Sequence, residues 1–263
     1  MSRTTKGPSI FNGDLAVIGN QIEEVLKKIE HIPVLVVSYN NGSYVSNMVR
    51  QLNTLGITPI VLDNKSDDRE TVNILNTIKT SDQAHVFFAK KNHGHMIGFR
   101  EPIYKKLPQH FAYTDPDLLL NSELPADFLS VLSKLTETMC VFKAGMALPL
   151  QVNDLIAATE NQHHLTRRRP FIFKRVYSVN EWEESFWTQR LRHELEIYGA
   201  PVDTTFAVYN KRMFRGDFLR GIRVAGAYSA IHLPWFPTLD IMAPEQRKKY
   251  LQDNISSTWN IKA

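Results

Sequence analysis

The segment Ile32-Pro33-Val34-Leu35-Val36-Val37-Ser38-Tyr39-Asn40 decides the fold class of this chain. Its apolar, β-branched run has the length of a strand and shows no polar alternation. That pattern is typical of a strand covered on both faces, as in a parallel sheet with helices on either side. We therefore predict a buried central strand that ends in the polar residues Ser38, Tyr39 and Asn40.

The residues that follow predict a helix and then a second strand. Apolar side chains recur at spacings of three and four from Val45 to Leu55, with Ser43 as the expected N-cap and Gly56 as the stop. Residues 58–63 form the next apolar run and end in Asp63. A strand, a helix and a strand within about thirty residues make one βαβ unit, so the two strands should be parallel.

The same alternation continues toward residue 114. We expect a helix through Val72, Leu75 and Ile78, a third strand over 84–88 and a fourth over 110–114. These elements predict an α/β fold with a central, mostly parallel sheet flanked by helices. In such sheets ligands bind beyond the carboxyl ends of the strands, where Ser38, Asp63, Ala89 and Asp115 would lie.

The stretch Thr114-Asp115-Pro116-Asp117 places two carboxylates where the fourth strand should end. Mg²⁺ and Mn²⁺ prefer hard oxygen ligands and keep open positions for substrate phosphates, so the pair suits such a metal. The other interpretation is a strand-to-loop turn, in which Pro116 ends the strand and the aspartates cap the backbone that follows.

Several segments carry a resemblance through their order and spacing: 36–40, 61–68, 92–98, 114–117, 199–207 and 224–235. Together they resemble nucleotide-sugar glycosyltransferases of the GT-A type, particularly the inverting family two and its bacterial surface-polysaccharide relatives. The resemblance implies one GT-A domain over 1–263, with a nucleotide-sugar-binding half at about 30–150 and an acceptor-binding half at about 151–263.

The chain departs from the common family-two pattern in two places. The chain has Asp-Thr-Thr-Phe where Glu-Asp is frequent, which leaves the catalytic base open, and it lacks the Gln-x-x-Arg-Trp motif of processive polymerases, which favours transfer of one sugar.

The resemblance also implies roles for individual residues. The residues expected to contact the nucleotide sugar are Ser38, Tyr39, Asn40, Asp63, Asn92, Gly94 and Asp115. Asp115, Asp117 and His232 are expected at the metal, although His232 could equally be a core histidine satisfied by the backbone. Asp203 is expected as the catalytic base, with Glu194 and Glu196 in reserve; the alternative for Asp203 is a capping turn with Thr205.

The activity implied by the resemblance is transfer of one sugar from a nucleoside-diphosphate sugar to a hydroxyl of a glycan or lipid-linked acceptor, with inversion. The cofactor would be Mn²⁺ or Mg²⁺, the donor a UDP-hexose, and the setting cell-surface polysaccharide biosynthesis. Two alternatives remain open: a non-catalytic nucleotide- or carbohydrate-binding protein and a sugar nucleotidyltransferase. The nucleotidyltransferase usually carries cations in the loop after the first strand, and residues 38–43 contain none.

Length and composition agree with one globular domain. The 263 residues are 43% hydrophobic and carry a formal charge of +4, too little to indicate a nucleic-acid partner but suited to anionic substrates or peripheral contact with an anionic membrane. The cations gather in two clusters: Arg167, Arg168, Arg169, Lys174 and Arg175, then Lys211, Arg212, Arg215, Arg220 and Arg223. Most of these should lie on solvated faces. With the single cysteine Cys140 and no apparent export signal, we expect a cytoplasmic location, including the inner face of the membrane.

Histidines and tryptophans give weaker signals. His93 and His95, with His85 and His110, could suggest zinc, but no cysteine pair or helical His-x-x-x-His accompanies them, so we do not predict zinc. Sugar rings pack on aromatic planes, which makes Trp182, Trp187 and Trp235 candidates for sugar contact; core packing is the alternative for each.

Overall fold

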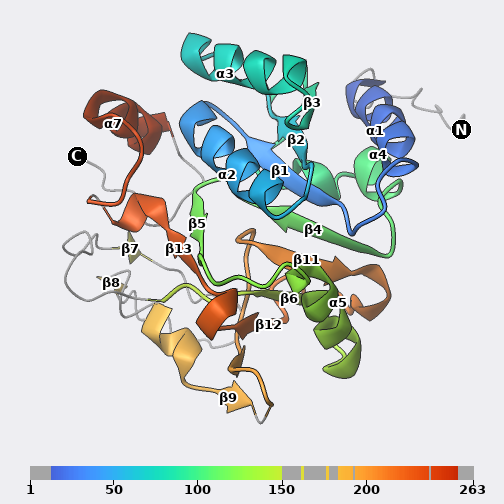
Figure 1. Ribbon diagram of the computed structural model, residues 1–263, viewed down its shortest axis with the longest axis vertical. Helices are drawn as coiled ribbons and strands as arrows, with labels where there is room; N and C mark the ends of the chain where they lie inside the picture. Colours follow the sequence, from blue (N-terminus) through green and yellow to red (C-terminus); the bar gives the residue numbers. More distant parts are fainter. Residues whose placement is uncertain are drawn as a thin grey trace, which may run out of the picture.

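The computed structural model describes residues 13–149, 161–162, 176–177, 183–191, 193–236 and 238–253 (Figure 1). Its helices are α1 (Gly13–Leu26), α2 (Gly42–Thr54), α3 (Arg69–Thr80), α4 (Glu101–Tyr104), α5 (Phe128–Thr138) and α7 (Pro244–Asp253). Its strands are β1 (Val34–Ser38), β2 (Ile60–Asp63), β3 (His85–Phe88), β4 (His110–Thr114), β5 (Leu118–Leu120), β6 (Lys143–Met146), β7 (Asn161–Gln162), β8 (Val176–Tyr177), β9 (Arg190–Leu191), β10 (Ile197–Gly199), β11 (Ala207–Asn210), β12 (Gly221–Val224) and β13 (Ala230–His232).

One nine-stranded sheet joins the two halves of the chain. Its strand order is β3-β2-β1-β4-β11-β6-β12-β10-β9. The strands β3, β2, β1 and β4 run parallel, β11 is antiparallel to both of its neighbours, and β12 runs parallel to β6. The expected α/β fold with a mostly parallel sheet is confirmed.

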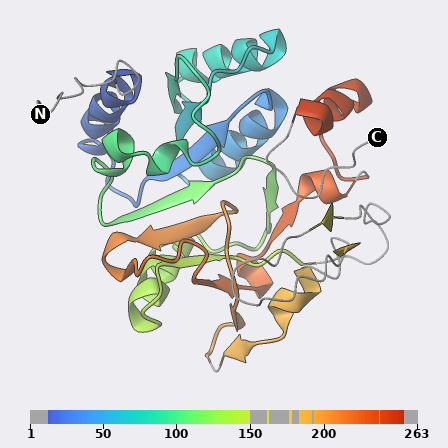
Figure 2. The same cartoon turned by 180° about the vertical axis from the view of Figure 1, so that it is seen from behind.

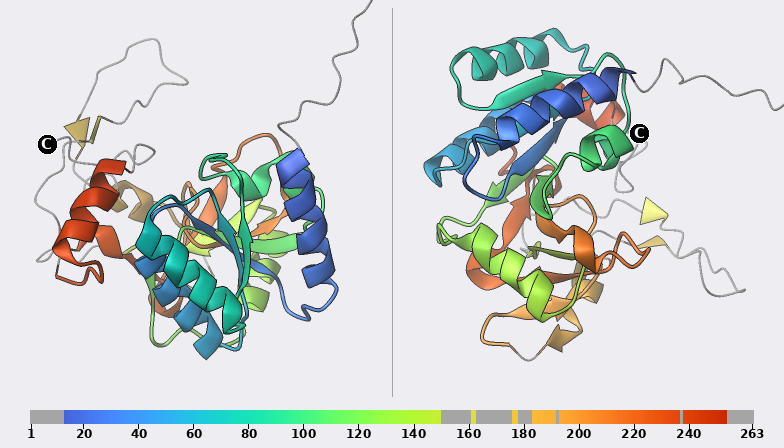
Figure 3. Two further views of the ribbon diagram at one scale, coloured as in Figure 1. Left: turned by 90° about the horizontal axis from the view of Figure 1, so that it is seen from above. Right: turned by 90° about the vertical axis from the view of Figure 1, so that its right-hand side faces the viewer.

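The central strand β1 has side chains in both hydrophobic layers of the molecule. Val34 and Val36 pack in the layer formed with α2, α3 and α5, whereas Leu35 and Val37 pack in the layer formed with α1. All four are at most 6% exposed. Successive residues of a strand point to opposite faces, so an apolar run without alternation requires cover on both sides. Figure 3 shows α1 and the pair α2 and α3 on opposite sides of the first strands, and in Figure 2 α4 lies beside α1.

Most predicted elements of the first half are present, and one detail was wrong. The expected strands and helices appear as β1, α2, β2, α3, β3 and β4, and Gly56, with φ of +75°, follows the end of α2. Ser43 is not the N-cap. The helix begins at Gly42, whose N–H donates to Thr71 Oγ1 at 3.1 Å, because α3 supplies the acceptor that a local cap would have provided.

A long connection in the second half crosses one face of the sheet. Residues 200–206 link β10 to β11, and Val202 packs over Gly145 of β6 and Gly221 of β12. A Cβ added at Gly145 would lie 2.7 Å from Val202 Cγ1, closer than real Cβ contacts come. These glycines therefore let the connection lie directly on the sheet and carry Asp203 back to the carboxyl edge of β4.

The C-terminal segment returns to the first half of the chain. Strand β13 pairs antiparallel with β5, the strand that follows Asp117. Helix α7 then packs beside α2, through a cluster formed by Tyr44, Leu233, Met242 and Tyr250 (Figure 1). The predicted seam near residues 150–170 lies almost entirely outside the described residues.

Candidate active site at the carboxyl edge of the sheet

The carboxyl ends of β1, β2 and β4 bring the expected site segments to one edge. Ser38 is in register with Asp63, and Val36 is in register with Thr114, the residue before Asp115. Parallel strands end at the same edge, which is where ligands bind in open α/β sheets. The structure therefore brings Ser38, Asp63 and Asp115 to one edge, as predicted.

Asp63 is enclosed by its own turn. Its side chain is 1% exposed, and its two oxygens accept from the hydroxyl and the backbone N–H of Ser66, at 2.6 and 3.0 Å. Burial raises the pKa of Asp63, although hydrogen bonds from Ser66 oppose the rise. In this geometry Asp63 holds the turn after β2, and a contact with the base or ribose stays a prediction.

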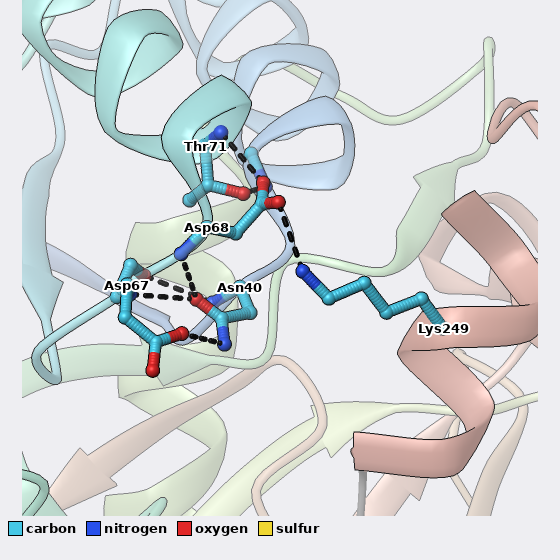
Figure 4. A network of polar contacts seen from close by, with 7 residues as sticks. Asn40, Asp67, Asp68, Thr71 and Lys249 are labelled. Atoms are coloured by element: carbon cyan, nitrogen blue, oxygen red, sulfur yellow. Dashed lines mark hydrogen bonds and ion pairs between the residues drawn. The ribbon is translucent and has the colours of Figure 1, made fainter. Parts of the chain in front are cut away.

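Asn40 ties the end of β1 to the start of α3 (Figure 4). Its side-chain oxygen accepts from the N–H groups of Asp67 and Asp68, both at 3.0 Å, and its amide donates to the Asp67 carboxylate. Asp68 accepts from Thr71 N at 2.9 Å as the N-cap of α3 and pairs with Lys249 of α7 at 3.1 Å. Asn40, Asp68, Lys249 and Tyr250 line part of a shallow hollow between α2, α3 and α7.

Asn64, which the sequence analysis left without a role, organises the loop after β3. It is 2% exposed; its amide donates to the Asn92 side chain and to Gly94 O, and its oxygen accepts from His93 N. Asn92 also accepts from Gly94 N at 2.8 Å, and Gly94 has φ of +84°. The structure thus joins Asn92 and Gly94 to the turn after β2, while Tyr39 lies half-buried at the end of β1.

The connection formed by residues 200–206 is bonded directly to Asp115. Asp115 N donates to Thr204 O at 3.0 Å, and the Thr204 hydroxyl donates to Asp115 Oδ2 at 2.6 Å. Thr204 adjoins Asp203, whose side chain is exposed. The two predicted site segments, 114–117 and 199–207, are therefore in contact although they lie almost ninety residues apart.

Asp117 lies beneath the C-terminal segment. The residue is 4% exposed. Its Oδ2 accepts from the Tyr250 hydroxyl at 2.9 Å and lies 3.3 Å from His232 Nε2. Its Oδ1 is buried and has no hydrogen-bond partner among the described residues. An ionised carboxylate with one unsatisfied buried oxygen is costly, so Oδ1 calls for a partner such as a water or a cation.

The two neighbouring carboxylates have opposite pKa shifts. Burial and the charge of Asp117 raise the pKa of Asp115 well above its usual range, although Thr204 opposes the rise. Burial acts in the same direction on Asp117, but His232 and the Tyr250 hydroxyl outweigh it and lower its pKa. Two carboxylates that share a site cannot both ionise cheaply, so the pair favours one negative charge until a cation is added.

The residues at this edge fit a divalent cation that a substrate helps to bind. Asp115 and the free oxygen of Asp117 are hard donors of the type that Mg²⁺ and Mn²⁺ take. Within the described ranges, no group of three His, Cys, Asp or Glu side chains forms a ready metal cage. That is consistent with Mg²⁺-type sites, in which one or two carboxylates and substrate phosphates complete the shell.

Buried cations hold the backbone around Asp203. Lys143 of β6 is fully buried, and its Nζ donates to Asp203 O at 3.2 Å, as does the Tyr209 hydroxyl. Desolvation lowers the pKa of Lys143 to about 7. Arg223 pairs with the buried Glu183 at 2.5 Å and donates to Pro201 O at 2.9 Å. Lys143 and Tyr209 therefore hold the connection at Asp203, and Arg223 holds it at Pro201.

The reserve candidates lie farther from Asp115 along the sheet. Glu194 and Glu196 precede β10, which β11, β6 and β12 separate from β4, and Glu196 accepts from Tyr198 at 2.6 Å. His85 and His110 occupy the amino ends of β3 and β4, and His93 lies beside Asp14 of α1. These histidines do not converge on one point.

The remaining aromatic and basic candidates have mainly structural contacts. Trp235 is 6% exposed and packs against His232, with ring centroids 4.4 Å apart, and Trp187 packs against Tyr198. Lys211 donates to two backbone carbonyls, whereas Arg212, Arg215 and Arg220 are exposed. Trp182 and the first basic cluster lie outside the described residues.

The fold and site define an α/β protein whose paired carboxylates meet the 200–206 connection at the carboxyl edge of the parallel strands. No protein-family model and no curated protein matches the chain. Among solved structures it is similar to the mannosyltransferase PcManGT from Pyrobaculum calidifontis in complex with GDP-Man and Mn²⁺, with 13% identity, a TM-score of 0.43, and coverage of 90% of this chain and 76% of that one. It is also similar to S. aureus TarS 1–349, with 14% identity, a TM-score of 0.37 and coverage of 68% of this chain; it spans 47% of the TarS chain. The likeness is distant, and we base the proposed function on the chain's own residues.

Proposed function

We propose that the chain is a metal-dependent glycosyltransferase that moves one sugar from a nucleoside-diphosphate sugar to an acceptor hydroxyl. The observation that carries the proposal is the contact between Asp115 and Thr204, which joins the carboxylate pair to the loop that bears Asp203. A sugar transferase needs these two functions side by side: a site for the diphosphate leaving group and a base for the attacking hydroxyl.

Asp115 and Asp117 would hold Mn²⁺ or Mg²⁺ together with the donor diphosphate. When bound there, a divalent cation supplies positive charge that stabilises the departing diphosphate. The turn residues Ser38, Tyr39 and Asn40, with Asn92 and Gly94, would border the nucleotide. Asn64 bonds to Asn92, Gly94 O and Ser38 O, and Asn40 N donates to the Ser66 hydroxyl, so these turns are held in place before the donor arrives.

Asp203 would act as the general base of an inverting transfer. The acceptor oxygen attacks the anomeric carbon, its proton passes to the Asp203 carboxylate, and the bond to the diphosphate breaks with the electron pair going to the nucleotide. Asp203 suits this role because its carboxylate is exposed while its backbone oxygen is held by Lys143 and Tyr209. An exposed side chain on a fixed backbone can meet an acceptor without losing position.

The donor is expected to be a UDP-hexose and the acceptor a glycan or lipid-linked sugar of a cell-surface polysaccharide. A thermal-shift screen of UDP, GDP, CDP and dTDP, with and without Mn²⁺, would identify the nucleotide, since a ligand of the native state raises stability by RT ln(1 + [L]/Kd). Release of nucleoside diphosphate from the matching sugar donor separates an enzyme from a non-catalytic binding protein. Consumption of a nucleoside triphosphate and sugar phosphate would instead indicate a nucleotidyltransferase.

Peripheral membrane association is supported by residues 211–220. This stretch exposes Arg212, Arg215 and Arg220 together with Phe214 and Leu219, which are 43% and 45% exposed. Leu219 O accepts from Val202 N, so the stretch borders the Asp203 loop. None of the helices in the described ranges is both long and apolar enough to cross a bilayer.

We expect R212E/R215E to reduce sedimentation with anionic vesicles, and K79E/K134E, with the same charge change, to leave it intact. Equal loss in both variants would contradict a local docking surface.

A further inference from the structure

Asp117 uses its two oxygens differently, and the C-terminal segment causes the difference. Tyr250 of α7 donates to Oδ2, and His232 of β13 lies against the same oxygen. Leu233 N also donates to Asp117 O at 2.9 Å, so the backbone of the segment is held beside Asp117 as well. The other oxygen, Oδ1, is buried without a donor among the described residues.

We propose that Tyr250 is a positioning residue for the metal site, which acts with His232 to fix Oδ2 of Asp117 and so present Oδ1 to the cation. His232 would then orient a ligand, and it would not be a ligand itself. This inference rests on the proposed function, because it assigns the metal to Asp117. It adds that a helix some 130 residues later in the sequence determines which way the carboxylate faces.

Groups that orient a metal ligand act through a hydrogen bond to the atom that the metal does not take. Tyr250 meets this requirement by its geometry, because its hydroxyl donates to Oδ2 at 2.9 Å and Oδ1 is left without a donor among the described residues. A hydroxyl that donates to Oδ2 discourages the carboxylate from rotating and exchanging its two oxygens.

The fold also restrains Tyr250. Its ring meets the ring of Tyr44 of α2 edge to face, with centroids 5.3 Å apart. Asp240 accepts from the Tyr44 hydroxyl at 2.8 Å and pairs with Arg247 at 2.6 Å, one turn before Tyr250 on α7. Lys249 pairs with Asp68 at the N-cap of α3. These contacts with α2, with the N-cap of α3 and with Asp240 hold α7 against the first half of the chain.

The pair Tyr44 and Tyr250 provides a matched experiment. Each ring lies in the same cluster and each hydroxyl donates to an aspartate, but only Tyr250 reaches Asp117. Tyr250→Phe and Tyr44→Phe therefore remove equivalent hydroxyls while both keep the ring contact. Binding of Mn²⁺ in the presence of UDP or GDP, followed by electron paramagnetic resonance, measures the site without turnover.

We expect Tyr250→Phe to weaken Mn²⁺ binding by about 10- to 100-fold, the range for loss of an outer partner of a metal ligand, and Tyr44→Phe to leave it within about twofold. Equal Mn²⁺ affinity in wild type and Tyr250→Phe, or equal losses in both variants, would overturn the inference while leaving the metal site in place. If wild type itself showed no nucleotide-dependent Mn²⁺ binding, the proposed function would fail instead.

The role of His232 has its own readout. If His232 orients Asp117, the bound Mn²⁺ has only oxygen ligands, and electron spin-echo spectra show no coupling to a directly bonded histidine nitrogen. A directly bonded ¹⁴N signal that disappears in His232→Gln would show that His232 is a ligand and would overturn its positioning role.

Discussion

Asp63 and Asp117 belong to the same edge of the sheet and are almost equally buried, at 1% and 4% exposure, yet they are bonded in different ways. Both oxygens of Asp63 accept hydrogen bonds from one neighbour in the sequence, Ser66. Asp117 receives its bonds at one oxygen, from the distant C-terminal segment, and its other oxygen has no donor in the described part of the chain.

This difference separates a structural carboxylate from a candidate ligand. Burial of a charged group costs free energy in either case, and the hydrogen bonds from Ser66 offset part of that cost at Asp63. At Asp117 the partners of Oδ2 outweigh the cost of burial, while Oδ1 is left without a donor among the described residues. Saturation of the hydrogen bonds, more than burial, therefore distinguishes Asp117 from Asp63 as the candidate metal ligand.

The largest effect is expected at Asp203. Unlike Asp63 and Asp117, this third aspartate has an exposed side chain. Asp203→Asn should lower turnover by about 10² to 10⁴, the range for loss of a positioned general base, while donor affinity stays near that of wild type. The amide is nearly isosteric, and the backbone bonds to Lys143 and Tyr209 remain. Steady-state kinetics with the identified donor measures this. A variant with full kcat, or a product that keeps the donor's anomeric configuration, would transfer the role to Glu194 or to a different mechanism.

Lys143 extends the comparison to a buried cation. Desolvation lowers its pKa from 10.5 to about 7, so the unfolded chain holds a proton between these values that the native protein has lost. The free energy of unfolding should therefore rise from pH 7 to pH 10.5, and below pH 7 the protein carries the full cost of the buried charge.

The Lys143→Met variant isolates this contribution. We compare the free energy of unfolding of the variant with that of wild type. The difference should favour the variant most below about pH 7, and it should fall by up to about 5 kcal/mol toward pH 10.5, because wild type gains stability over that range. Urea unfolding at several pH values measures the difference. Parallel pH profiles for the two proteins would show that Lys143 does not titrate in the native state as its burial implies.

A smaller effect is expected at Asp63. Asp63→Asn puts an N–H₂ group against the donors of Ser66 and should lower the free energy of unfolding by about 1 to 3 kcal/mol. Asp117→Asn should cost less stability, because it also removes the repulsion between the charges of Asp117 and Asp115. If Asp63 also contacts the base or ribose, Asp63→Ala weakens nucleotide binding with and without metal; unchanged binding would leave it with the turn alone. If Asp117→Asn lowered the free energy of unfolding more than Asp63→Asn does, this comparison of the two aspartates would be contradicted.

The first half of the fold was predictable because its information is local. The apolar run at β1 and the periodic helix α2 report burial directly, and parallel strands must end at one edge. The start of α2 was mispredicted because its first N–H donates to the hydroxyl of Thr71 on α3. No local sequence pattern reveals that contact.

The site was predictable in its chemistry but not in its partners. Asp115 and Asp117 follow from a strand that ends in two carboxylates. Thr204 and Tyr250 do not, because their hydroxyls reach these residues only through the chain's return to the carboxyl edge. The small-residue turn Gly199-Ala200-Pro201 shortly before Asp203 was a weak signal for Thr204, and nothing near Tyr250 in the sequence marks it.

The most direct test of the site is Mn²⁺ binding in the presence of UDP or GDP, compared among wild type, Asp117→Asn and Asp63→Asn. We predict tight nucleotide-dependent binding in wild type, loss of more than about 10²-fold in Asp117→Asn, since a direct ligand should cost more than an outer partner, and retained Mn²⁺ dependence in Asp63→Asn. Equal Mn²⁺ affinity in wild type and Asp117→Asn would contradict the assignment of the metal site to the carboxyl edge of the sheet.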